Sequence, residues 1–115
     1  MRYALLICTD ESAQAAASPE EIEQVMKAYD AFGAEMGARG VIRGAERLRP
    51  TTDATTVRVS GGEVLVSDGP FAETKEQMAG FYLIDCKDLD EAIEIASKVP
   101  AAQHGTVEVR PIWDM

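Results

Sequence analysis

Residues 80–86 have the sequence GFYLIDC and are followed at once by a helix-like pattern. This run is apolar on both of its alternating faces, which is typical of a β-strand that is covered on both sides. Residues 3–8, with the sequence YALLIC, show the same pattern near the start of the chain. Two such strands in a chain that also carries helix signals predict a mixed α+β fold.

The first long helix is predicted to begin at Ser18. Ser18 has the position of an N-cap, Pro19 is the first helical residue, and Glu21 completes a capping box. Apolar side chains then recur every three or four residues, which predicts a buried stripe along about five turns. The stripe consists of Ile22, Val25, Met26, Tyr29, Phe32 and Met36. Gly37 and Gly40 are the expected places for the helix to end.

A second helix is predicted after Asp88, which has the position of its N-cap, and before Pro100, which ends it. Its expected stripe consists of Leu89, Ala92, Ile93, Ala96 and Val99.

The other elements follow from alternation and turn residues. Strands are predicted at 41–48 and 106–112, and two alternating runs at 55–60 and 63–67 flank a Gly-Gly turn, as in a β-hairpin. A short helical turn is expected around 73–76.

The predicted order is β-α-β-(β-hairpin)-β-α-β, which corresponds to a ferredoxin-like split βαβ unit with an inserted hairpin strand. Two helices cover only one face of such a sheet, although the strands at 3–8 and 80–86 are apolar on both faces. Soluble monomers rarely leave such a surface in water. We therefore expect the open face to pack on a second copy, forming a dimeric α/β barrel; cover by the loops 9–17 or 68–78 is the alternative.

The chain has 115 residues, the size of a single domain spanning 1–115, and a formal net charge of −9. The acidic balance argues against nucleic acid and anionic membranes as partners, because binding to them requires a surplus of Lys and Arg. Ten carboxylates fall within 20–35 and 85–94, at the starts and outer faces of the two predicted helices. Most of the negative charge is therefore expected on the helical layer, opposite the apolar sheet face.

The sequence carries no recognisable targeting, metal or cofactor motif. The apolar run at the N-terminus is shorter than the ~7–15 residues of a signal peptide's apolar region, and no stretch reaches the ~20 apolar residues of a membrane span. Cys8 and Cys86 belong to no CxxC pair, and there is one His. The hairpin turn is a sufficient reason for Gly61 and Gly62, so these glycines do not indicate a phosphate-binding loop. We expect a cytoplasmic protein with two reduced thiols and neither metal nor cofactor.

Residues 68–76, with the sequence DGPFAETKE, closely resemble the DGPF branch of the YCII-related domain family. GFYLI at 80–84, VEVRP at 107–111 and YALLI at 3–7 fit the same branch, so the resemblance covers essentially the whole chain. It implies a dimeric α/β barrel of small bacterial proteins whose biochemical roles are mostly unassigned. Some of these proteins are encoded beside extracytoplasmic-function sigma factors, which implies a link to stress regulation.

Other YCII-type proteins carry a His on the first helix and an Asp just before the Pro that ends the second helix, a dyad interpreted as an acid/base pair. Here the first helix has no His, and Val99 stands before the proline. The resemblance therefore transfers no catalytic role to any residue. The remaining catalytic candidates are His104, with Asp68 or Asp30 as its carboxylate partner. The simpler interpretation is an exposed loop histidine and two surface carboxylates.

The loop that begins with Asp68-Gly69-Pro70-Phe71 and continues to residue 76, which we call the DGPF loop, has two interpretations. In the structural one, Asp68 accepts hydrogen bonds from the following amides, the next two residues set a turn, and Phe71 anchors the loop in the apolar layer. In the functional one, the loop borders a ligand pocket with Glu73 and Lys75 at its rim. The structural interpretation is favoured, because each residue type has a sufficient local reason to be there.

Three further side chains are ligand-binding candidates. Arg58 and Arg110 are expected to pair with Glu63 and Glu108 on the surface, or else to bind an anionic ligand. Tyr82 belongs either to the core or to a cavity between two sheets.

Two functions remain open. The first is a homodimeric barrel module that binds a small metabolite or a partner protein, and the missing dyad favours it. The second is a small enzyme with lyase-like or isomerase-like acid/base chemistry in the inter-sheet pocket, with His104 or Asp68 as the base.

Overall fold

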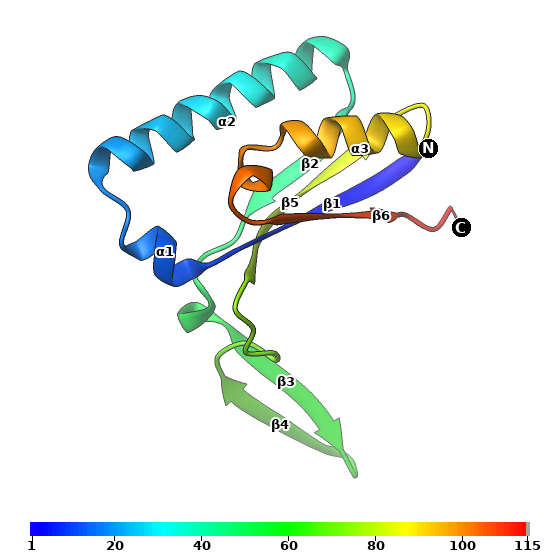
Figure 1. Cartoon of the computed structure of the whole chain (residues 1–115). Helices are drawn as coiled ribbons and strands as arrows, with labels where there is room; N and C mark the ends of the chain where they lie inside the picture. The colour runs from blue at the N-terminus through cyan, green and yellow to red at the C-terminus, as the bar shows by residue number, and fades with distance from the viewer. Residues whose placement is uncertain (115) are drawn as a thin grey trace.

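The structure is a computed structural model that describes residues 1–114. Helices and strands alternate along the chain, with a hairpin in the middle (Figure 1). The strands are β1 (Arg2–Thr9), β2 (Ile42–Arg47), β3 (Thr55–Ser60), β4 (Glu63–Asp68), β5 (Gln77–Asp85) and β6 (Thr106–Pro111). The helices are α1 (Glu11–Ala15), α2 (Pro19–Arg39) and α3 (Leu89–Lys98), with 3-10 turns η1 (Thr51–Asp53) and η2 (Pro100–Gln103).

The main sheet has the strand order β2-β5-β1-β6, and all of its neighbouring strands are antiparallel. β1 and β5 occupy the two central positions, as their apolar sequences require. The α+β class predicted from the sequence is confirmed.

The hydrophobic core lies between one face of this sheet and the two long helices. Side chains of β1 alternate, and those of Tyr3, Leu5, Ile7 and Thr9 are buried. They meet buried residues of both helices, and the helical part of this core consists of Phe32, Met36, Ala92, Ile95 and Ala96. α2 and α3 therefore cover the same face, and the other face of the sheet is left without a helix.

The predicted helix starts are confirmed. The Ser18 hydroxyl accepts a hydrogen bond from the Glu21 amide at 3.2 Å, while the Glu21 carboxylate accepts one from the Ser18 amide at 3.4 Å. Asp88 accepts a hydrogen bond from the Glu91 amide at 3.0 Å and caps α3. α2 ends at Gly40, whose φ of 67° is a left-handed conformation that favours glycine; Gly37 lies inside the helix.

The predicted apolar stripes are only partly buried. On α2, Ile22, Val25 and Met26 are exposed, because a helix of 21 residues spans about 31 Å and its first half extends past the sheet (Figure 1). On α3, Leu89 and Ile93 are also exposed, and Ile95 takes the core position that the sequence analysis did not assign.

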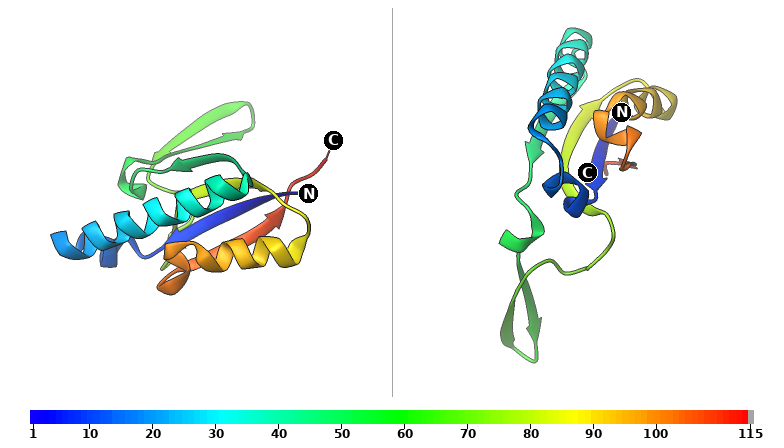
Figure 2. Two further views of the ribbon diagram at one scale, coloured as in Figure 1. Left: turned by 90° about the horizontal axis from the view of Figure 1, so that it is seen from above. Right: turned by 60° about the vertical axis from the view of Figure 1, so that its left-hand side comes forward.

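The inserted hairpin does not add a strand to the main sheet. β3 and β4 form a separate two-stranded sheet, and Figure 2 shows it projecting away from the rest of the molecule. Its turn is the predicted Gly-Gly pair, with φ of 57° at Gly61 and 82° at Gly62. The hairpin was recognised correctly, but its expected place was wrong, because alternation and turn residues report local pairing only.

Three local predictions between residues 9 and 76 were also wrong. The expected helical turn at 73–76 is an irregular loop, and a short helix, α1, occupies part of the expected loop 9–17. Asp10 caps α1 by accepting a hydrogen bond from the Ser12 amide at 2.9 Å. Phe71 does not anchor its loop in the apolar layer, since its side chain is 74% exposed.

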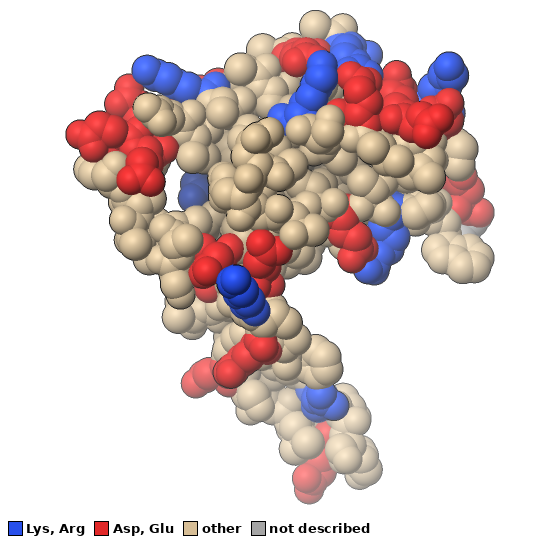
Figure 3. All heavy atoms as spheres, viewed as in Figure 1, with Lys and Arg blue, Asp and Glu red and all other residues tan. Residues whose placement is uncertain are grey.

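Ion pairs tie the outer surfaces of α2 and α3 together, in the acidic layer visible in Figure 3. The guanidinium of Arg39 donates hydrogen bonds to Glu94 at 2.9 and 3.0 Å, and this contact lowers the pKa of the Glu94 carboxyl below its ordinary value. A carboxyl with a lowered folded-state pKa stabilises the fold above its unfolded-state pKa of about 4.3.

We expect Glu94→Gln to lower the free energy of unfolding more at pH 7 than at pH 3, because the contribution of Glu94 is lost as the pH falls through its lowered folded-state pKa. Urea unfolding at both pH values measures this difference. Glu63→Gln, at the exposed hairpin tip, is the control for the loss of a carboxylate. If Glu94→Gln lowered the free energy of unfolding equally at both pH values, the stabilising role of the ionised Glu94 carboxylate would be contradicted.

Candidate functional site

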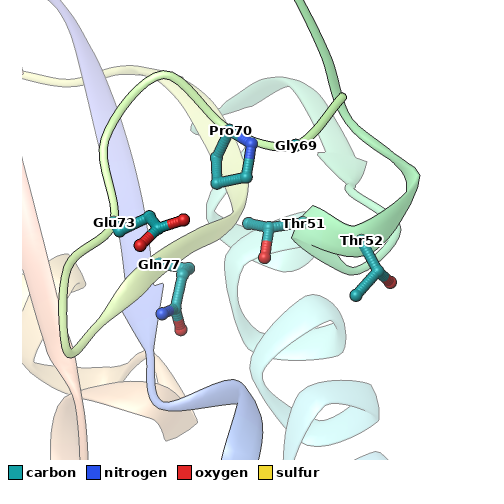
Figure 4. A pocket seen from close by; sticks show the side chains of 6 residues that line it. All are labelled: Thr51, Thr52, Gly69, Pro70, Glu73 and Gln77. Atoms are coloured by element: carbon teal, nitrogen blue, oxygen red, sulfur yellow. The ribbon is translucent and has the colours of Figure 1, made fainter. Parts of the chain in front are cut away.

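A hollow lies at the root of the hairpin, between η1 and the DGPF loop, with a volume of about 380 Å³. Figure 4 shows Glu73 and Gln77 on one side and Thr51 and Thr52 on the other, with Pro70 between them. Its lining residues are Thr51, Thr52, Gly69, Pro70, Glu73 and Gln77. The most specific motif in the sequence therefore forms one wall of this hollow.

Backbone contacts fix the DGPF loop at this wall. The Gly69 amide donates a hydrogen bond to the Ala54 carbonyl at 2.8 Å, and the Thr56 hydroxyl donates one to the Gly69 carbonyl at 2.8 Å. Gly69 has a φ of 94°, which a residue with a Cβ rarely adopts. The glycine of the motif thus has a conformational reason to be there, and it turns the chain from β4 into the hollow.

The opposite wall is held by Glu11 of α1. Its carboxylate accepts hydrogen bonds from the Thr51 amide at 2.8 Å and from the Thr51 hydroxyl at 2.7 Å. The Glu11 amide donates to the Gln77 side-chain oxygen at 3.2 Å, and the Gln77 side-chain nitrogen donates to the Thr74 carbonyl at 2.5 Å. α1, η1 and the start of β5 are therefore joined by one hydrogen-bond network around the hollow.

The lining offers hydrogen-bonding groups for a polar ligand. Thr52 contributes a hydroxyl and Glu73 a carboxylate, and the ring of Pro70 provides an apolar surface between them. A second hollow of about 260 Å³, lined by residues 47–50, directly precedes Thr51 in the chain. Its Arg49 pairs with Asp53 at 3.0 Å. The region combines hydroxyl, amide, carboxylate and guanidinium groups.

Of the residues proposed for the DGPF pocket, the structure brings Glu73 to the hollow, while Lys75 is exposed in the same loop and lies outside the lining. Asp68 is the last residue of β4, paired with Thr55 on the hairpin, and lies outside the lining as well.

The catalytic candidates are not brought together in this hollow. His104 is exposed at the end of η2, and Asp30 is exposed on α2. Neither belongs to the lining.

The other ligand-binding candidates have partners elsewhere. Arg110 pairs with Glu108 at 2.5 Å, as the simpler interpretation predicted. The guanidinium of Arg58 lies 4.8 Å from the centre of the Phe71 ring, a cation–π contact, rather than beside Glu63. Tyr82 lies on the helical face, where it packs against the core.

Burial is the main cause of the pKa shifts of the thiols and the tyrosine hydroxyls. It raises the pKa of the Cys8 and Cys86 thiols and of the Tyr3, Tyr29 and Tyr82 hydroxyls. A thiol with a raised pKa is a poor nucleophile at neutral pH. All five groups lie outside the hollow. Within residues 1–114, no cluster of three or more His, Cys, Asp or Glu side chains is arranged to hold a metal ion.

Sequence patterns did not predict the other lining side chains, Thr51, Thr52 and Gln77, or their support, Glu11. Residues 50–53 have a Pro followed by two Thr and an Asp, a pattern consistent with a polar turn. The contact with Glu11, 40 residues away, has no local signal in the sequence.

The chain is a small α+β domain with its long helices on one face of an antiparallel sheet. A hollow lined in part by the DGPF loop lies beside the sheet. The model of the YCII-related domain matches residues 1–115, and the chain belongs to that family. It is similar to an uncharacterized protein of Rhizobium meliloti (strain 1021), with 49% identity over 114 residues that cover 97% of this chain and 92% of that protein. In the described part of the chain, no helix is both long and apolar enough to cross a membrane.

Proposed function

We propose that this chain is a homodimeric module of the cytoplasm, one domain spanning 1–115, that binds a small polar metabolite in the hollow at the root of the hairpin. One observation carries the binding part of the proposal: the DGPF loop forms a wall of the hollow and is held there by the hydrogen bonds of Gly69. A loop fixed in this way presents its side chains with little loss of conformational entropy on binding.

The chemistry of the lining favours binding over catalysis. The hollow presents two Thr, a Gln, a Glu, a Gly and a Pro, which position a ligand through hydrogen bonds. It contains neither a His nor a Cys, the side chains whose ordinary pKa is nearest to neutrality. His104 lines neither of the two hollows, so the acid/base alternative based on it has no geometric support.

The open face of the main sheet supports the dimer. Leu6 lies opposite Phe81, and Ala4 lies opposite Leu83, on the face that has no helix. The chain exposes 8078 Å² in total, whereas a compact monomer of its mass exposes about 6,100 Å². The difference between these two areas is larger than about 800 Å², the area that each partner buries in a stable interface.

The strand order supports the ferredoxin-like arrangement that the sequence predicts. β1 and β2 are joined through α2 but are separated in the sheet by β5, and β5 and β6 are joined through α3 but are separated by β1. Two such interleaved βαβ units leave one face without helices. Packing two of these faces together would complete a barrel. The resemblance to proteins encoded beside sigma factors adds a stress-regulated process as the setting of the proposed binding.

The binding proposal predicts that pools of amino acids, sugars, nucleosides or organic acids will include one that raises the melting temperature, because a ligand that binds only the folded state stabilises it by mass action. At a concentration of 100 times Kd, this effect is about 2.7 kcal/mol. We expect Thr52→Val combined with Glu73→Gln to weaken the binding at least tenfold.

Glu63→Gln, which changes a carboxylate outside the hollow, is the matched control and is expected to preserve the shift. Thermal denaturation and titration calorimetry of the three proteins make the comparison. A shift of undiminished size in the Thr52/Glu73 variant would overturn the assignment of the hollow. Absence of a shift with every pool would argue against a small metabolite.

A further inference from the structure

The hairpin formed by β3 and β4 has an apolar face that no other element within residues 1–114 covers. Val57 lies opposite Val66 and Val59 opposite Val64, so that the four side chains share one face of the two-stranded sheet. Their exposed fractions are 60, 62, 69 and 65%, respectively. We call this surface, formed by Val57, Val59, Val64 and Val66, the valine face.

The hairpin is regular despite this exposure. All six residue pairs from Thr55–Asp68 to Ser60–Glu63 are in register, and both turn glycines have the positive φ of a tight hairpin turn. An isolated two-stranded hairpin is at best marginally stable in water. A long, ordered hairpin with four exposed valines therefore requires a surface that covers it.

We propose that the valine face packs on a second copy of this chain, so that the hairpin is an arm by which each subunit of the dimer holds the other. This inference rests on the proposed dimer and adds a second contact to it, separate from the open sheet face. In a two-fold dimer the contact occurs twice, once for each arm.

The shape of the chain supports a second copy as the occupant. Its radius of gyration is 16.2 Å, whereas a compact domain of this length has one of about 13 Å. Its principal extents are 49 × 44 × 18 Å, and the hairpin projects from one end (Figures 1 and 2). Six residues per strand give the arm a length of about 20 Å, enough to reach past its own sheet onto a neighbouring subunit.

The valine face carries few charges, so charge repulsion does not prevent a second copy from packing on it. The chain carries a net charge of −9, so two copies repel each other unless they meet through surfaces with few charges. The valine face has a single charged neighbour on the same side, Asp68 at the root of the hairpin, while Arg58 and Glu63 lie on the other side. Acidic side chains gather over the helices, and others lie along the hairpin and near its root (Figure 3). The arm therefore offers an apolar contact to an equally acidic partner.

The arm is tested by placing the photo-cross-linking residue benzoylphenylalanine at Val64 or at Leu65, which are neighbours on opposite faces of β4. The mass of each protein in solution is measured by sedimentation. We expect a dimeric protein in which Val64 forms a cross-link between subunits and Leu65 does not. In addition, Val59→Asp combined with Val64→Asp is expected to raise the dimer dissociation constant at least tenfold, while Leu65→Asp changes it less than twofold.

The outcomes separate the two proposals. A dimer with no cross-link from Val64, or with equal cross-links from both positions, overturns the arm and leaves the dimer standing. A cross-link from Val64 to its own chain also overturns the arm. A monomer at every concentration overturns both proposals.

Discussion

Leu6→Asp is expected to convert the protein from a dimer into a folded monomer. Leu6 is at the centre of the open sheet face, with Phe81 beside it on β5 and Glu108 on β6. An aspartate there places an unpaired charge in the proposed interface, at a cost of about 3 kcal/mol or more, which corresponds to at least a hundredfold increase in the dimer dissociation constant. Size-exclusion chromatography with light scattering measures the mass, and circular dichroism the fold.

Ile93→Asp is the matched control for this substitution. Ile93 is 52% exposed on α3, in the layer that covers the opposite face of the sheet. We expect this variant to have the same mass as the unaltered protein. If the Leu6→Asp protein remained a dimer of undiminished affinity, the open sheet face would not be the interface.

Gly105→Ala is expected to lower the free energy of unfolding by about 2 kcal/mol or more, in the upper part of the range for overpacked sites. Gly105 lies between η2 and β6, and a Cβ there would be 2.5 Å from the Cys8 carbonyl oxygen and 3.0 Å from Cγ2 of Thr9. Both atoms belong to β1, one of the two central strands, and the Cys8 carbonyl oxygen is a backbone atom that cannot move without disturbing the sheet. Urea denaturation at a fixed protein concentration measures the loss.

Gly33→Ala is the same chemical change, and we expect it to have the opposite effect on the free energy of unfolding. A Cβ at Gly33 on α2 would have no atom within 4 Å, and alanine is favoured over glycine inside a helix by about 1 kcal/mol. This variant is therefore expected to be more stable than the unaltered protein. A Gly105→Ala protein within about 0.5 kcal/mol of the unaltered one would show that β1 and η2 are less tightly joined than the structure indicates.

The parts of the fold that depend on neighbouring residues were predictable from the sequence. The capping box at Ser18, the cap at Asp88 and the Gly-Gly turn each involve residues a few positions apart, and all three are confirmed. The extent of burial was not predictable in the same way. Helical periodicity placed Ile22 and Ile93 in buried stripes, but only the tertiary structure determines how far the sheet extends beneath each helix.

The candidate site was only partly predictable for the same reason. The sequence pointed to the DGPF loop and to Glu73 through a continuous motif. The other wall depends on hydrogen bonds between Glu11 and Thr51, which are 40 positions apart, and no pattern in a single sequence connects them. Phe71 was expected in the apolar layer because of its residue type, and its contact with Arg58 on the hairpin is equally non-local.

Sedimentation equilibrium of the unaltered protein tests the central claim most directly, because the open sheet face and the valine face both require a second copy. The mass of one chain is 12.4 kDa. We predict a species of twice that mass at micromolar concentration. A species of 12.4 kDa that persists as the concentration is raised would contradict this prediction.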